Sequence, residues 1–159
     1  MHKTSNIDLQ LEILISTMNR TSLDFLKPMF INSSAEHYQI LIINQTTEDA
    51  ILESDKGNIR VVNSFETGLP QSRNLAIKHA LGDVCLIADD DVVYSSSFRN
   101  SILNAHVEHA SADIITFKMT DEDGNLYRNY PHISKHNKDS IRTANSVVIS
   151  FKRENLLKS

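Results

Sequence analysis

Short apolar runs typical of buried strands alternate along this chain with segments whose pattern is typical of helices. The strand-like runs lie at residues 11–15, 38–43, 59–63, 84–88, 113–119 and 146–151. Helical patterns are expected near residues 23–30, 70–81 and 98–110, and another begins at residue 153. Parallel neighbours in a sheet need a crossover connection of about a dozen residues or more. The alternation therefore predicts an α/β fold with a mainly parallel sheet flanked by helices.

Local signals mark the ends of the expected helices. Thr21 or Ser22 can accept hydrogen bonds from the free N–H groups of the first helix, and the serines at 95–97 can cap the third. Pro70 suits the first position of the second helix because it has no N–H, and Gly82 suits the left-handed residue that commonly ends a helix. No linker or repeat interrupts the pattern, so residues 1–159 are expected to form one domain.

Composition excludes several classes of protein. A chain of 159 residues that is 40% hydrophobic and 23% charged can bury a core without disulfides. Its net charge of −4 is spread along the chain, so nucleic acid is not expected as a partner. Cys85 lies in an apolar run and is expected to be a buried free thiol, and no segment approaches the ~20 apolar residues of a membrane span. We expect a cytoplasmic protein, which can also be peripheral at the inner face of the membrane.

Three adjacent aspartates, Asp89, Asp90 and Asp91, directly follow the apolar run at 84–88. Packing three negative charges together is unfavourable unless a cation or hydrogen-bond donors offset them. Mg²⁺ and Mn²⁺ prefer such hard oxygen ligands, and Mg²⁺ often takes one or two carboxylates together with substrate phosphates. Asp89 and Asp91 can point the same way from a turn, so these two are the expected metal ligands. Taken alone, the triplet is equally compatible with a solvated acidic loop.

The carboxyl ends of the strands are where an open parallel sheet binds ligands. Four segments at these ends or in the helices that follow carry a resemblance. They read Ile-Ser-Thr-Met-Asn-Arg at 15–20, Ile-Ile-Asn-Gln-Thr at 42–46, Gly-Leu-Pro-Gln-Ser-Arg-Asn-Leu-Ala-Ile at 68–77, and Gly-Asp-Val-Cys-Leu-Ile-Ala-Asp-Asp-Asp at 82–91. In this order, the set resembles family 2 of the nucleotide-sugar glycosyltransferases, whose fold is the Rossmann-like GT-A type.

The resemblance implies an activity. It implies an enzyme that moves a sugar, with inversion and with help from a divalent cation (Mn²⁺ or Mg²⁺), from a nucleoside-diphosphate sugar to an acceptor hydroxyl. A UDP-sugar is the first choice of donor, the acceptor is a saccharide or a lipid-linked molecule, and polysaccharide biosynthesis is the expected process. A non-catalytic nucleotide-sugar-binding module or an inactive enzyme fragment is the alternative.

The resemblance also implies residue roles. Ser16 and Thr17 match the loop that touches base and ribose, and Arg73 matches a residue that faces the nucleotide. Asp89 and Asp91 match the Asp-x-Asp motif, in which the first carboxylate holds ribose or metal-bound water and the second binds the metal. The expected donor-binding residues are Ser16, Thr17, Asn19, Asn44, Arg73, Asp89 and Asp90, and the expected metal ligands are Asp89 and Asp91.

Two departures from the family pattern matter. Met18 stands where an aromatic residue is common, and Asn44 and Gln45 replace paired aspartates, one of which accepts a hydrogen bond from uracil. An Asn side chain can still pair with a base edge, so the donor base stays open. In the family, a pattern like that at 145–154 is followed by a Glu-Asp pair whose Asp is the catalytic base. The base is therefore expected beyond Ser159, in a C-terminal acceptor segment that this sequence lacks.

Other candidate sites and functions are weaker. The acids at 121–123 are expected to belong to a hairpin turn, and the paired histidines at 106 and 109 and at 132 and 136 lack a recognisable third metal ligand. The aromatic stretch 127–132 suits either stacking on a sugar or packing as a hairpin edge. The segment 16–20 contains no glycine, which argues against a sugar-nucleotide-forming nucleotidyltransferase and a dinucleotide-binding fingerprint, and no P-loop is present.

Overall fold

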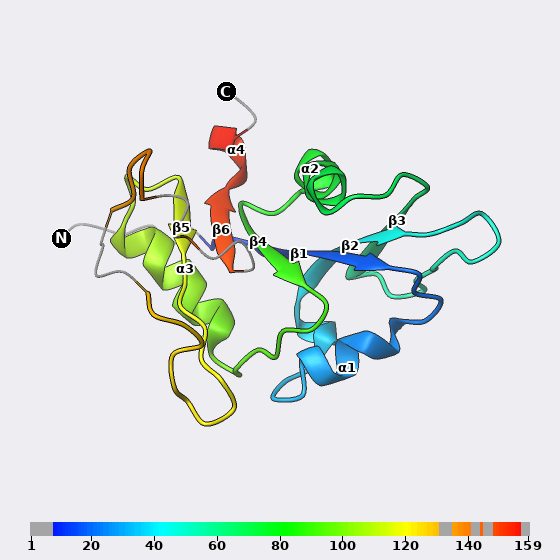
Figure 1. Ribbon diagram of the computed structural model, residues 1–159, viewed down its shortest axis with the longest axis horizontal. Coiled ribbons are helices and arrows are strands. Elements are labelled where there is room, and N and C mark those ends of the chain that lie inside the picture. Colours follow the sequence, from blue (N-terminus) through cyan, green and yellow to red (C-terminus); the bar gives the residue numbers. More distant parts are fainter. Residues whose placement is uncertain (1–7, 131–134, 141–143, 145–147, 157–159) are drawn as a thin grey trace.

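A computed structural model describes residues 8–130, 135–140, 144 and 148–156 of the chain (Figure 1). Six strands form one sheet in the order β3-β2-β1-β4-β6-β5. The strands are β1 (Leu11–Met18), β2 (Gln39–Gln45), β3 (Ile59–Ser64), β4 (Val84–Asp89), β5 (Ile114–Thr116) and β6 (Ile149–Lys152). The first four strands are parallel, whereas β6 lies antiparallel between β4 and β5. The expected α/β fold with a mainly parallel sheet is confirmed.

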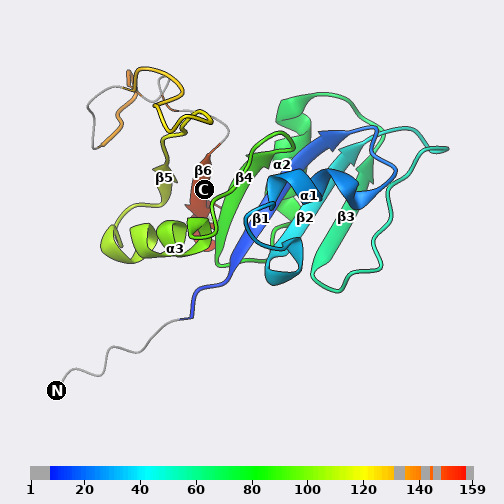
Figure 2. The same cartoon turned by 90° about the horizontal axis from the view of Figure 1, so that it is seen from below.

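Helices cover both faces of this sheet. The longer ones are α2 (Leu69–His79) and α3 (Phe98–Glu108), and the short ones are η1 (Leu23–Phe25), α1 (Leu26–Met29), η2 (Ala35–His37) and α4 (Arg153–Leu156). Figures 1 and 2 show α1 and α3 on one face and α2 on the other. Because both faces are covered, the central strands β1 and β2 are buried along nearly their whole length rather than alternating between buried and exposed residues.

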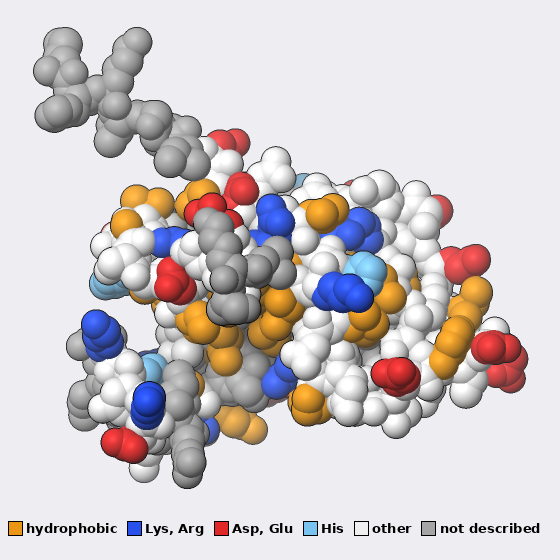
Figure 3. All heavy atoms as spheres, turned by 90° about the horizontal axis from the view of Figure 1, so that it is seen from above, with side chains coloured by type: hydrophobic (Ala, Val, Ile, Leu, Met, Phe, Trp, Pro, Cys, Tyr) orange, Lys and Arg blue, Asp and Glu red, His pale blue; other side chains and the backbone are white. Residues whose placement is uncertain are grey.

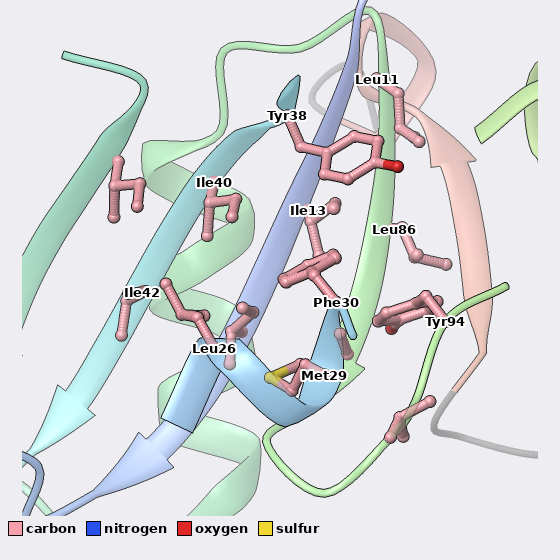
Figure 4. Packing of buried hydrophobic residues seen from close by; sticks show 14 of the residues in the cluster. Leu11, Ile13, Leu26, Met29, Phe30, Tyr38, Ile40, Ile42, Leu86 and Tyr94 are labelled. Carbon is pink, nitrogen blue, oxygen red and sulfur yellow. The ribbon is translucent and has the colours of Figure 1, made fainter. Parts of the chain in front are cut away.

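Two hydrophobic clusters form the core, one on each face of the sheet. Alternate residues of one strand divide between them: Ile13 faces the α1 and α3 side, whereas Leu14 faces α2. On the first side, the rings of Phe30 and Tyr94 stack with their centroids 5.5 Å apart (Figure 4). The ring of Phe98 packs at a tilt against Tyr94, with the centroids 4.5 Å apart. These contacts hold the segment that follows the acidic triplet against α1 and α3.

The first helix differs from expectation. Residues 23–30 form a 3₁₀ turn followed by a single α-helical turn, not one continuous helix. Pro28 lies within this segment and has no N–H to extend the α-helical hydrogen-bond pattern. Ser22 does cap the segment, since its side chain accepts from the Asp24 N–H, as expected. At the third helix Ser97 occupies the N-cap position, but its side chain makes no capping bond.

The role expected for Gly82 is wrong. The second helix begins one residue earlier than expected, with Pro70 in its first turn, and it ends at His79 without a left-handed residue at Gly82. Gly82 instead lies where the chain approaches the first strand closely, because a Cβ there would come 2.6 Å from the Cβ of Glu12. The glycine is therefore required by packing between distant segments, which local sequence signals do not reveal.

The last strands are shorter than expected. The strand expected at 113–119 forms a ladder only over Ile114–Thr116, because it pairs with the short strand β6. The strand expected at 146–151 is observed as Ile149–Lys152, and residues 145–147 lie outside the described residues. The hairpin turn expected to contain the acids at 121–123 is confirmed by an antiparallel bridge between Thr120 and Leu126.

The surface carries charged side chains of both signs. On the face shown in Figure 3, lysine and arginine side chains are scattered among acidic ones. Within the described residues, no helix combines the length and apolar character needed to cross a bilayer. Cys85 is a buried free thiol, as expected, and burial raises its pKa to about 12.

Candidate functional site

The carboxyl ends of β1, β2 and β4 lie side by side. Ser16 is the register partner of Asp89, and Thr17 is the partner of Asn44. Ser16–Met18 had been expected in a loop but belong to β1, because β2 continues the ladder to Met18 and β4 continues it to Ser16. The chain leaves β1 toward β2 on one side and reaches β4 on the other, so this edge is a topological switch point, where open sheets bind ligands. The pairing of these strands thus brings three separate sequence segments together.

Asp90 is turned toward the end of β1. Its Oδ2 accepts a hydrogen bond of 2.5 Å from Thr17 Oγ1 and one of 2.7 Å from Arg20 Nη2. Arg20 also lies over the ring of Phe25, 5.1 Å from its centroid, so its guanidinium is held from two sides. Burial raises the pKa of Asp90, but the hydrogen bonds from Thr17 and Arg20 and the charge of Arg20 outweigh it and hold this pKa below its ordinary value.

Asn44 fixes the backbone that carries Arg20. Its Oδ1 accepts from the Arg20 N–H, and its Nδ2 donates to the Arg20 carbonyl and to Asn63 Oδ1. Asn44 is fully buried, so a contact with a donor base would require one of these bonds to be exchanged, and its donor-binding role stays a prediction. The neighbouring Asn19 is exposed, adopts a left-handed φ of 53° and donates its N–H to the Gln45 carbonyl.

Asp89 is turned toward α2, away from the partners of Asp90. Its Oδ1 lies 3.0 Å from Arg73 Nη2. The start of α2 is held to the end of β2, since Gln45 Nε2 donates to the Gly68 carbonyl, and Gly68 has a φ of 132° that favours glycine. This tie aims the first turn of α2, and with it Arg73, at the end of β4.

The third aspartate, Asp91, is exposed after the end of β4. In the part of the chain that the structure describes, no three His, Cys, Asp or Glu side chains converge to hold a metal ion. Two carboxylates are nevertheless a sufficient protein contribution for Mg²⁺ or Mn²⁺ when phosphate oxygens complete the coordination. The donor chemistry at Asp89 and Asp91 therefore fits a divalent cation that binds together with a diphosphate.

Sequence reasoning missed two residues here. Arg20 closes the segment 15–20 but was given no role, and only its position next to Asp90 reveals one. Tyr94 was also missed: its hydroxyl is buried without a hydrogen-bond partner among the described residues, and burial together with the charge of Asp89 raises its pKa. A local signal existed for Arg20, as the one arginine at the end of the first strand, but none existed for Tyr94.

The weaker candidates lie elsewhere in the structure. His106 is a core residue whose Nε2 lies 2.7 Å from Ser150 Oγ, and His109 is exposed, so they do not form a metal site. His132 lies outside the described residues, and His136 Nδ1 lies 3.2 Å from the Ser140 carbonyl oxygen. The aromatic stretch 127–132 was expected either to stack on a sugar or to pack as a hairpin edge, and its two described tyrosines differ in this respect.

In that stretch, Tyr130 is packed and Tyr127 is exposed. Two cations lie over the Tyr130 ring: Lys118 Nζ is 6.0 Å from its centroid, and the Arg128 guanidinium is 5.2 Å from it. Tyr127 is 67% exposed on the opposite strand of the hairpin from Met119. Tyr130 therefore serves packing, and Tyr127 is the ring left open to solvent.

Comparison with known proteins identifies the family. The model of the family described as Glycosyl transferase family 2 matches residues 12–156. The search of curated proteins gave no match. Because the family model covers most of the chain, it extends the resemblance of the four segments beyond the acidic triplet.

Solved structures share the fold. The crystal structure of S. aureus TarS 1–349 has a TM-score of 0.62 and 16% identity, over 94% of this chain and 49% of that one. Its complex with UDP-GlcNAc has the same TM-score and identity, over 94% and 47%. The mannosyltransferase PcManGT from Pyrobaculum calidifontis, in complex with GDP-Man and Mn²⁺, gives 0.53 and 14%, over 94% and 46%. This chain spans about half the length of these proteins and has their GT-A fold, and it belongs to glycosyl transferase family 2.

Proposed function

We propose that this chain binds a nucleoside-diphosphate sugar at the carboxyl ends of β1, β2 and β4 and transfers the sugar to an acceptor hydroxyl with inversion. The observation that carries the proposal is the position of Asp89 and Asp91 at the switch point of the sheet, in a member of family 2. A UDP-sugar is the proposed donor, since TarS has been solved with UDP-GlcNAc and UDP. PcManGT, which has been solved with GDP-Man, supports the same class of ligand.

The chemistry follows from charge. A nucleoside diphosphate gains negative charge as it leaves the sugar, and a divalent cation bound at the site would neutralise that charge. Asp89 and Asp91 supply hard oxygen ligands for the cation, which we propose to be Mn²⁺ or Mg²⁺. Arg73 brings a planar guanidinium to the same place and can bind phosphate oxygens through two parallel hydrogen bonds. Thr17 and Arg20 hold Asp90 and so fix the backbone between the two cation ligands.

Inversion requires a base on the face of the sugar opposite the leaving group. The acids of the hairpin turn do not suit this role. Asp121 Oδ1 accepts from the N–H groups of Asp123 and Asn125, so its carboxylate stabilises the turn that carries it. We therefore do not assign the base to Asp121, and we name no catalytic residue among the described acids of this turn.

The acceptor and the location belong to the same proposal. A saccharide or lipid-linked acceptor fits sugar transfer in polysaccharide biosynthesis. A cytoplasmic position, peripheral at the inner face of the membrane where a lipid-linked acceptor would be reached, is supported by the free buried thiol of Cys85, which suits a reducing compartment.

The cation site is tested with Asp91→Asn. This change removes one negative charge and one hard oxygen ligand from an exposed position, so it is expected to leave the fold intact and to abolish Mn²⁺-dependent binding of UDP. Calorimetric titration with UDP and other nucleoside diphosphates, with and without Mn²⁺, measures it. Asp55→Asn removes the same charge from an exposed loop and is the matched control. UDP binding by Asp91→Asn that equals the wild type would contradict the cation assignment.

A second measurement separates an enzyme from a binding module. Sugar transfer and donor hydrolysis are assayed with the protein expressed from its complete reading frame, with Mn²⁺ and a panel of nucleoside-diphosphate sugars. Release of nucleoside diphosphate that depends on the acceptor supports transfer. Tight donor binding without release would instead assign the chain to a non-catalytic nucleotide-sugar-binding module.

A further inference from the structure

The Arg73 guanidinium is mostly buried, and its Nε makes no hydrogen bond within the described residues. The side chain is only 17% exposed, and Nη2 is held by Asp89 Oδ1 at 3.0 Å. Nε is buried and has no hydrogen-bond partner within the described residues, and the same holds for Oγ of the neighbouring Ser72. A buried donor without an acceptor is unfavourable, because water has been removed from it and nothing has replaced the lost bond. These atoms mark a place where an acceptor from outside the chain would be favourable.

The acidic triplet is largely neutralised by the protein's own arginines. Asp89 pairs with Arg73 on the α2 side, and Asp90 pairs with Arg20 on the α1 side. No ion pair is found for Asp91 within the described ranges, and this side chain is exposed. A divalent cation that approaches the triplet alone therefore meets one unpaired carboxylate and, close to Asp89, a fixed positive charge.

A cation and a guanidinium compete for the same carboxylate. Both are positive, so a metal ion bound to Asp89 must either displace Arg73 or tolerate its repulsion at short range in a partly buried place. A diphosphate changes this balance, because its oxygens are acceptors that match the guanidinium fork and can satisfy Nε together with a terminal nitrogen. Arg73 then loses Asp89 but gains a partner of higher charge.

We propose that Arg73 is the resident counter-ion of the cation site. It holds Asp89 in the free chain, opposes the binding of a divalent cation on its own, and turns to the diphosphate when cation and nucleotide bind together. The inference rests on the proposed function, since it assumes that both ligands bind at this edge of the sheet. Its consequence is coupled loading: each ligand strengthens the binding of the other, by the same factor in both directions.

The test uses Arg73→Gln and two opposite expected changes. Without Arg73, Mn²⁺ alone is expected to bind about fivefold more tightly, the upper range for losing a partly exposed ion pair. UDP in saturating Mn²⁺ is expected to bind about tenfold more weakly, because a charge-assisted phosphate contact is lost. Calorimetry measures UDP, and the paramagnetic resonance signal of free Mn²⁺ measures the cation. A purely structural salt bridge would not move the two affinities in opposite directions.

One control variant lies in the same helix as Arg73, and a second variant changes Arg73 itself to another residue. Lys78→Gln removes one positive charge from an exposed position of α2 and is expected to change both affinities by less than about twofold. Arg73→Met, which keeps an unbranched side chain without the charge, repeats the measurement should the glutamine variant fail to fold. If the wild type binds no nucleoside diphosphate with Mn²⁺, the proposed function fails. If it does bind, but neither Arg73 variant gains affinity for Mn²⁺ alone, the counter-ion role is overturned and the proposed function stands.

Discussion

Glu12 is a buried acid in the first half of β1, away from the candidate site. It is only 3% exposed, yet its oxygens are fully engaged. Oε1 accepts from Arg60 Nη2 at 2.5 Å, and Oε2 accepts from the N–H groups of Leu81 and Gly82 at 2.5 and 2.9 Å. One carboxylate thereby ties β1 to β3 and to the turn that precedes β4, and it compensates the loss of hydration with three donors.

Glu12→Ala is expected to lower the free energy of unfolding by about 3 kcal/mol, because it leaves the buried Gly82 N–H, the part-buried Leu81 N–H and the Arg60 guanidinium without this acceptor. Urea unfolding followed by circular dichroism measures the loss. Lys27→Ala, which breaks the exposed pair with Asp24, is the control and is expected to change the free energy of unfolding far less, because water screens this pair. A loss for Glu12→Ala as small as that of the control would show that water replaces the lost carboxylate.

Residues of the candidate site differ in how far sequence could identify them. The aspartates at 89–91 stand out because an apolar run ends in three charges, which is a local pattern. Their division between Arg73 and Arg20 could not be read from the chain, because Arg20 and Asp90 are 70 positions apart. The sequence gives no sign of the role of Glu12 either. An acid within a strand-like run has the same local pattern whether or not distant hydrogen-bond donors reach it in the fold.

At the level of elements, α3 is attached to the antiparallel part of the sheet through a polar contact in the core. His106 of α3 is 2% exposed, and its Nε2 lies 2.7 Å from the hydroxyl of Ser150 in β6. Nδ1 is buried and has no partner among the described residues. Burial lowers the pKa of His106 from its ordinary value of 6.5, and the nearby charge of Lys152 lowers it further.

This pKa predicts a pH dependence of stability. The folded chain binds fewer protons at His106 than the unfolded chain does, so its contribution is complete above pH 6.5 and is lost as the pH falls below that value. Urea unfolding at about pH 7.5 and about pH 5 should therefore show a smaller decrease in stability for His106→Gln than for the wild type. The exposed His109→Gln should retain the wild-type decrease. An unchanged decrease in His106→Gln would assign the effect to other groups.

The elements themselves were predicted in kind more reliably than in length. Strands β1, β2 and β4 are longer than their apolar runs, because pairing with neighbouring strands extends the ladder into polar residues such as Thr17 and Asn44. Strand β5 is shorter than its run because its partner β6 is short. The hydrophobic pattern indicates which residues are buried. The length of a strand depends instead on the strand that pairs with it, and the pattern does not identify that partner.

For the molecule as a whole, the sheet order sets a hierarchy of local stability. Strands β1 and β4 are paired on both sides and carry almost fully buried residues, whereas β5 is a three-residue edge strand with Ile114 47% exposed. Amide hydrogen exchange followed by mass spectrometry should show the slowest exchange in β1 and β4 and much faster exchange in β5. Protection of β5 equal to that of β1 would mean that the antiparallel end unfolds together with the parallel core.

Sequence by itself determined where the strands lie, that they alternate with helices, that the sheet is mainly parallel, and that three carboxylates stand at the end of one strand. These properties follow from local periodicity and from the length of the connections. Tertiary structure alone decided that β6 enters antiparallel between β4 and β5, that Gly82 is needed beside Glu12, and that Asp89 and Asp90 face different arginines. Each of these depends on which distant groups come within hydrogen-bond or contact distance, and a linear pattern of residue types does not carry distances between remote positions.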